Sequence, residues 1–161
     1  MSETRILAVA GLGQAAAQLG TQVFDPPSLL TIYIRISGHS LLSAARIFFN
    51  NDQGNNYAFS VSESFALPST GLSGSGINLA SVLDGSPQGL TLLIGNGPNQ
   101  THAVTFSGMS GLLDGSVAPR LVQGAGIWTP TSQITSVQLD AGSVGGNLNA
   151  GTGILVVGTL T

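Results

Sequence analysis

Short stretches in which apolar and polar residues alternate, separated by Gly and Asn, dominate this sequence. The clearest runs from Thr31 to Ser37, where Ile32, Ile34 and Ile36 fall on one face of an extended chain. A period of two is typical of a β-strand that is buried on one face. Helical periodicity is almost absent from the rest of the chain, so we expect an all-β fold.

Three further pairs of segments are expected to form hairpins. Each pair is joined by residues that favour turns, such as Asn-Gly or Asn and Asp side chains that tolerate left-handed backbone. In chain order the pairs are residues 46–50 with 57–63, 90–94 with 101–106, and 132–139 with 153–160. Two Gly/Ser-rich connections, residues 68–86 and 110–119, have room for one short strand each.

About eight strands at this spacing predict a single β-sandwich of jelly-roll type over residues 26–161. Residues 1–25 differ in composition and precede Pro26-Pro27, which favours extended backbone. We expect this segment to be an N-terminal arm that packs on a neighbouring subunit; a frayed tail is the alternative. The arm residues predicted to contact neighbours are Arg5, Ile6, Leu7 and Val9.

The charge content is very low. Only 7% of the 161 residues are charged, against roughly 25% in ordinary soluble domains. Four basic residues and a net charge of −3 argue against nucleic-acid binding, and no apolar run is long enough to span a membrane as a helix. Because charged surfaces keep monomers apart, this composition indicates a subunit that covers much of its surface with other protein.

One motif resembles a dinucleotide fingerprint. A possible strand, Ile6 to Ala10, is followed by Gly11-x-Gly13-x-x-Ala16. That fingerprint requires a following helix and a second parallel strand, yet Gly20 interrupts the helix and Pro26-Pro27 occupies the place of the strand. We therefore expect no nucleotide cofactor.

No arrangement of catalytic or metal-binding residues is evident. His102 shares a strand face with Val104 and Phe106, which favours a core or interface role, and His39 is expected in a loop. Asp52, among several Asn side chains, has too little negative charge around it for a good Ca²⁺ site. The chain is expected to have no catalytic residues, no cofactor and no metal, and not to be an enzyme.

Trp128 is the single tryptophan. In an all-β chain such a residue is most often a core anchor. The alternative is an exposed platform for a sugar ring, which would make the chain a carbohydrate-binding module.

Three segments carry a family resemblance. They are Arg46 to Tyr57 (RIFFNNDQGNNY), Ile134 to Leu139 (ITSVQL) and Gly145 to Gly153 (GGNLNAGTG). Together they resemble small β-rich virion proteins of tailed bacteriophages, of the capsid decoration (cement) type. The apolar final segment, Gly153 to Gly158, departs from that pattern.

The resemblance implies a structural role without chemistry. We expect a capsid decoration protein, a homotrimer on the outer surface of the capsid in the virion, which binds the major capsid protein and stabilises the shell. A tail, baseplate or fibre component is the alternative within the same particle.

Overall fold

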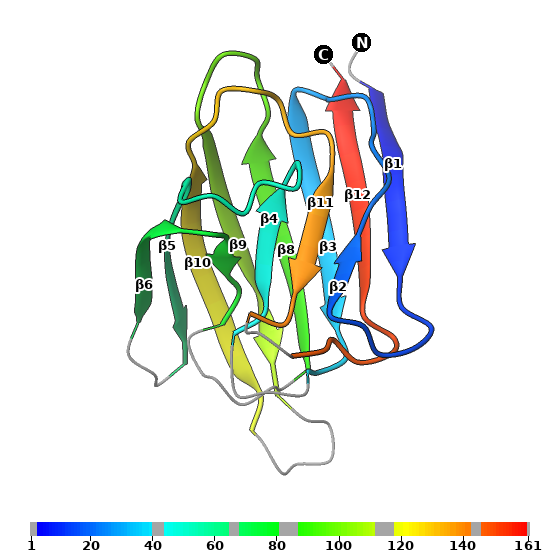
Figure 1. Ribbon diagram of the computed structural model, residues 1–161, viewed down its shortest axis with the longest axis vertical. Helices are drawn as coiled ribbons and strands as arrows, with labels where there is room; N and C mark the ends of the chain where they lie inside the picture. Colours follow the sequence, from blue (N-terminus) through cyan, green and yellow to red (C-terminus); the bar gives the residue numbers. More distant parts are fainter. Residues whose placement is uncertain are drawn as a thin grey trace.

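Two antiparallel β-sheets pack face to face in the computed structural model, which describes residues 3–39, 44–64, 68–80, 87–111, 118–142 and 146–160 (Figure 1). All named elements in these residues are strands, so the predicted all-β sandwich is confirmed. They number twelve rather than about eight. The jelly-roll connectivity stays a prediction.

The larger sheet has eight strands and the smaller sheet has four. In spatial order the larger sheet contains β1 (Glu3–Gly11), β12 (Gly153–Leu160), β3 (Leu29–Ile36), β8 (Gln88–Gly95), β9 (His102–Ser110), β10 (Arg120–Trp128), β5 (Tyr57–Glu63) and β6 (Ser69–Gly74). The smaller sheet contains β2 (Gln18–Gly20), β11 (Val137–Asp140), β4 (Arg46–Phe49) and β7 (Ile77–Asn78).

The core lies between the two sheets. Ile32, Ile34 and Ile36 point inward from β3 and are at most 3% exposed, as their alternation predicts. They meet Ile47 and Leu139 of the smaller sheet in one continuous apolar cluster. Each such side chain stabilises the fold by about 1.5–3 kcal/mol through burial, so this interlayer contact holds the larger sheet in place.

One of the three predicted hairpins forms, and two do not. β8 and β9 pair along their length, as predicted for 90–94 and 101–106. β4 and β5 instead belong to different sheets, and so do β11 and β12. The predictions were wrong because turn residues also connect strands that cross between layers, and β4 and β11 are buried at all but one position each.

β10 was not predicted, because Gly124 and Gly126 replace apolar residues at inward positions and break the alternation. Neighbouring side chains fill the space that the two glycines leave. A Cβ at Gly124 would fall on the Phe106 ring, and one at Gly126 would lie 2.7 Å from Ile77 Cδ1. Large side chains on β9 and β7 therefore take the place of side chains missing from β10.

The segment predicted as an arm is part of the sandwich over its described residues. β1 pairs antiparallel with β12 from Glu3 to Gly11, with an irregularity between Ile6 and Ala8, and β2 pairs with β11. The separation at residue 25 is therefore not seen in this chain. β1 supplies one free edge of the larger sheet.

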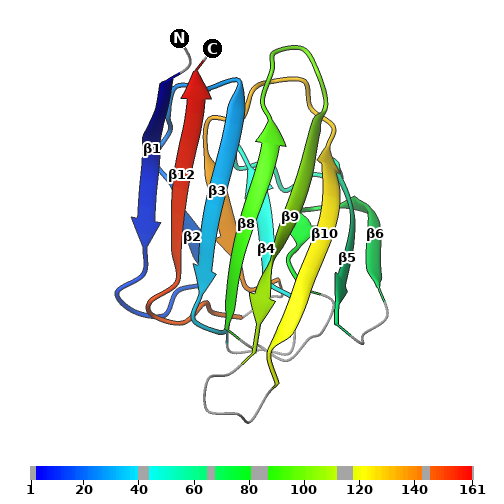
Figure 2. The same ribbon diagram turned by 180° about the vertical axis from the view of Figure 1, so that it is seen from behind.

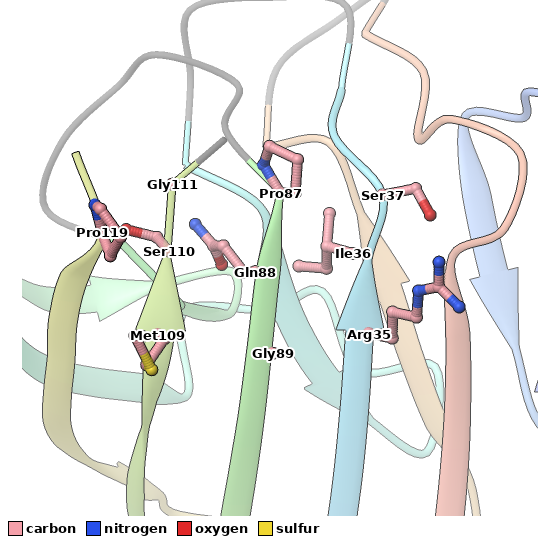
Figure 3. A pocket seen from close by; sticks show the side chains of 10 residues that line it. All are labelled: Arg35, Ile36, Ser37, Pro87, Gln88, Gly89, Met109, Ser110, Gly111 and Pro119. Atoms are coloured by element: carbon pink, nitrogen blue, oxygen red, sulfur yellow. The ribbon is translucent and has the colours of Figure 1, made fainter. Parts of the chain in front are cut away.

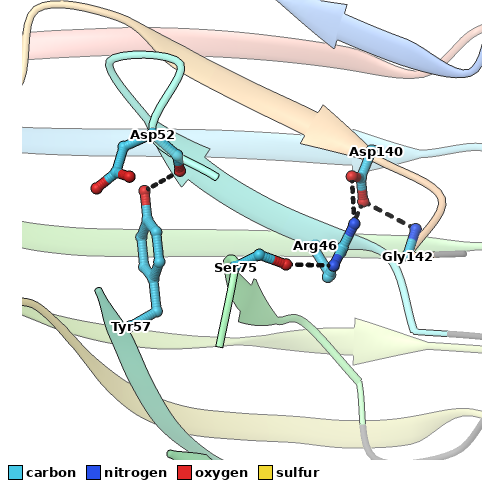
Figure 4. Close-up of polar contacts among 6 residues, drawn as sticks. All are labelled: Arg46, Asp52, Tyr57, Ser75, Asp140 and Gly142. Carbon is cyan, nitrogen blue, oxygen red and sulfur yellow. Dashed lines mark hydrogen bonds and ion pairs between the residues drawn. The ribbon is translucent and has the colours of Figure 1, made fainter. Parts of the chain in front are cut away.

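An ion pair joins the two central strands of the smaller sheet. Arg46 donates from Nε to Asp140 Oδ1 at 3.0 Å and from Nη2 to Oδ2 at 2.7 Å (Figure 4). Its Nη1 donates to Ser75 Oγ at 2.7 Å. Two parallel bonds to a carboxylate are the strongest geometry for such a pair, so Arg46 ties β4 to β11 and to the segment after β6.

Candidate interaction surface

The loop between β4 and β5, which follows Arg46–Phe49 and ends at Tyr57, is a dense hydrogen-bonded unit. The Asp52 carboxylate accepts bonds from Trp128 Nε1 at 2.7 Å, Asn56 Nδ2 at 2.9 Å and the Gly54 amide at 2.9 Å. The Tyr57 hydroxyl donates to the Asp52 carbonyl oxygen at 3.0 Å (Figure 4). The motif residues therefore bind one another and the core.

Asn50 anchors the same loop to the segment before β11. Its Nδ2 donates to the Gln133 carbonyl at 2.9 Å, and its Oδ1 accepts from the Thr135 and Ser136 amides at 2.8 and 3.1 Å. Asn50 has a φ of 53°, in the left-handed region that Asn tolerates better than most residues. The local geometry and the side-chain bonds together explain why Asn stands here.

These contacts make the loop a structural element. In the described chain the Asp52 carboxylate accepts its hydrogen bonds from N–H donors, which stabilise its negative charge and occupy the oxygens that a cation would need. Burial raises the pKa of Asp52, but hydrogen bonds from Trp128, Asn56 and Gly54 outweigh it, so the net pKa lies below 3.8. In the part of the chain that the structure describes, no three His, Asp or Glu residues group as metal ligands.

Both histidines and the tryptophan are buried. Trp128 is 1% exposed and stacks on His102, with ring centroids 5.2 Å apart. The His102 ring nitrogens lie 3.1 Å from the Gly95 carbonyl and 2.9 Å from the Ser132 carbonyl. His39 is 8% exposed and bridges to Leu148. Trp128 is thus a core anchor. It is too buried to be the exposed platform that the carbohydrate-binding hypothesis requires.

The glycine motif after β1 does not open a helix. The chain turns after Gly11, and Ala16 then forms a β-bridge with Leu148. The Leu12 amide donates to the Thr152 carbonyl at 2.9 Å. The motif residues therefore lie in a turn and a β-bridge, and not at the helix N-terminus on which a dinucleotide fingerprint depends.

The feature that no sequence motif indicated is the face of the larger sheet that points away from the smaller one. We call the outward positions of its five central strands the outer face, and Figure 2 shows it with no strand of the smaller sheet in front. Its residues are Gly153, Leu155, Val157 and Thr159 on β12; Leu29, Thr31, Tyr33 and Arg35 on β3; Gly89, Thr91, Leu93 and Gly95 on β8; Ala103, Thr105, Ser107 and Met109 on β9; and Leu121, Gln123, Ala125 and Ile127 on β10.

Arg35 is the single charged residue among these twenty positions, and several others are large and apolar. Leu93, Met109 and Leu121 are each 50% exposed or more, and Met109 and Leu121 face each other across β9 and β10. Single exposed apolar side chains are common, but monomers seldom carry a broad uncharged face of this kind.

The extent of the outer face matches that of a protein interface. With a strand spacing of about 4.8 Å and a rise of about 3.3 Å per residue, five such strands cover a flat area of about 600 Å². The projecting side chains add to this area. A standard interface buries about 800 Å² on each partner. The outer face is therefore large enough to serve as one side of a stable contact.

The predicted contact residues on β1 lie beside this face. Ile6 and Val9 are 65% and 69% exposed, whereas Leu7 is partly buried against the core. Arg5 is exposed, and its Nη2 lies 3.9 Å from Asp25 Oδ2, a distance at which a surface pair contributes little. Their role in contacts between subunits stays a prediction.

No protein-family model matches the chain, and no curated protein matches its sequence. Among the described residues, no helix is long and apolar enough to cross a membrane.

Proposed function

We propose that this chain is a non-enzymatic structural subunit of a viral particle, a capsid decoration protein of the tailed-bacteriophage type. In this role it binds the major capsid protein on the outside of the shell, as a homotrimer, and stabilises the shell. The observation that carries the proposal is the outer face, which is broad, carries several exposed apolar side chains and has Arg35 as its single charge.

Physical chemistry supports a contact role for such a face. A charged side chain must lose water when a protein covers it, at a cost that pairing offsets only in good geometry. Thr, Ser, Ala and Leu side chains lose far less, so the outer face can be covered at low cost. The resemblance of the loop motif to phage virion proteins adds support from the sequence; in this sandwich Asp52 and Asn50 fix that loop to the core.

Association and shell binding test the proposal together. Purified protein is analysed by sedimentation and native mass spectrometry, then mixed with capsids that lack it and pelleted. We expect a trimer that pellets with the capsids. A monomer that stays in the supernatant would contradict the proposal, and a trimer found only on tails would favour the tail alternative.

A further inference from the structure

Arg35 is the arginine without a carboxylate partner in the described chain. The other three, Arg5, Arg46 and Arg120, each lie within 3.9 Å of a carboxylate oxygen. No hydrogen bond or ion pair of the Arg35 side chain occurs among the described residues, and the residue is exposed. A guanidinium has five N–H donors in a fork that fits a carboxylate, so this group is available to an anion from outside.

Glycines isolate Arg35 on the sheet. Its register partners are Gly153 on β12 and Gly89 on β8, so neither neighbouring strand places a side chain beside it. A Cβ at Gly89 would meet nothing within 4 Å, which shows that the space above it is open. On the far side of Gly89, its partner Met109 is 57% exposed.

These residues border a hollow of about 590 Å³ at the end of the outer face (Figure 3). Arg35 stands on one side and Met109 and Pro119 on the other, with Gly89 between them. The lining thus combines one unpaired cation with apolar side chains. A volume of this size falls within the range of small-ligand sites.

We propose that this hollow binds an acidic peptide segment of the partner protein. A carboxylate pairs with Arg35, and an apolar side chain packs on Met109 and Pro119. The inference rests on the proposed function for the identity of the partner, the major capsid protein, and adds a specific anchor to the outer face. The chemistry of the hollow can be tested without that partner.

The probe is N-acetyl-leucine, which carries a carboxylate, an amide N–H and an apolar side chain, and its neutral control is N-acetyl-leucinamide. Amide and methyl resonances are followed by NMR during titration to about 20 mM. A dissociation constant on the order of 1 mM is expected for so small a ligand. The shifts should centre on Gly89 and Met109, and N-acetyl-leucinamide should bind at least about tenfold more weakly.

Two variants and two matched controls make the test specific. Arg35→Gln removes the charge and Gly89→Leu fills the hollow, and each should weaken binding about tenfold or more. Arg5→Gln removes an exposed arginine elsewhere, and Gly95→Leu adds the same bulk at the other end of β8, where a Cβ meets only Gln100 at 4.0 Å. Both controls should bind as the unaltered protein does, and an unchanged spectrum away from the substitution shows that each variant is folded.

Equal shifts with the acid and the amide, unchanged binding in both variants, or no shift at about 20 mM would each overturn the inference. These outcomes leave the proposed function standing if the protein still binds capsids. Conversely, specific binding of N-acetyl-leucine by a protein absent from particles would overturn the proposed function and leave the anion site in place.

Discussion

Trp128 Nε1 lies 2.7 Å from Asp52 Oδ2, so a buried indole at the end of β10 is bonded to a carboxylate in the loop between the two sheets. The indole also packs against Phe49 and Tyr57, with ring centroids 5.7 and 6.4 Å apart. This contact couples the loop, both layers and the main aromatic cluster of the core.

The Asp52–Trp128 bond should contribute measurably to stability. In a double-mutant cycle of Asp52→Ala and Trp128→Phe, we expect a coupling free energy of about 1–2 kcal/mol, because each change removes the same hydrogen bond to a charged group. Urea unfolding of the four proteins measures it. Strictly additive losses of unfolding free energy would mean that the bond has no net effect. Asp25→Asn, at an exposed carboxylate, serves as the control and should change the free energy of unfolding by less than about 0.5 kcal/mol.

Acid should weaken the fold through the same carboxylate. The hydrogen bonds from Trp128 and its neighbours hold the pKa of Asp52 below 3.8 in the folded chain, so the unfolded chain binds the proton more readily. The contribution of Asp52 to the free energy of unfolding is therefore complete at neutral pH and falls as the pH drops below about 4. Urea midpoints at about pH 7 and pH 3 should differ less in Asp52→Asn than in the unaltered protein. An equal difference in both would contradict this pKa.

Two glycines on neighbouring strands should respond oppositely to the same change. Gly89→Ala should raise the free energy of unfolding by about 0.4–1 kcal/mol, because the added methyl group meets open space and the unfolded chain loses freedom. Gly108→Ala should lower it by more than that, since its Cβ would collide with the Gly89 carbonyl oxygen and lie 2.8 Å from Leu90 Cα. Thermal unfolding compares the two, and a stabilised Gly108→Ala variant would contradict the packing described.

A charge in the middle of the outer face should block capsid binding and leave the domain folded. Leu93 is 50% exposed, so Leu93→Lys should change the stability of the isolated domain by less than about 1 kcal/mol. Burial of the new ammonium in an interface would cost several kcal/mol, so we expect loss of capsid binding in the pelleting assay. Val23→Lys, at a residue 78% exposed outside the strands, is the matched control and should bind capsids normally. Normal pelleting of Leu93→Lys with capsids would exclude this face as the contact with the shell.

Local alternation predicted the positions of strands well, but not their partners. The predicted strand at residues 57–63 coincides with β5, and 153–160 coincides with β12. β10 was missed because the packing partners of Gly124 and Gly126, namely Phe106 and Ile77, come from other strands. Pairing across the sandwich depends on such long-range contacts, which a turn between two segments does not reveal.

The outer face could be predicted only in part. Low charge indicated contact with other protein, and the alternation of Tyr33 and Arg35 with isoleucines placed them opposite the core. The hollow beside Arg35 needed the register, because Gly89 and Gly153 lie far from Arg35 in the chain. The structural role of the Asp52 loop likewise could not be predicted from its motif, because it depends on a hydrogen bond from Trp128, which lies far away in the chain.

The number of copies per particle tests the central claim most directly. Particles from a culture that produces this protein are purified on a gradient, and the ratio of this chain to the major capsid protein is measured by quantitative mass spectrometry. Decoration of the shell predicts hundreds of copies per particle, in a simple ratio to the major capsid protein. Absence of the chain from purified particles, or only a few copies that separate with the tails, would contradict a decoration role.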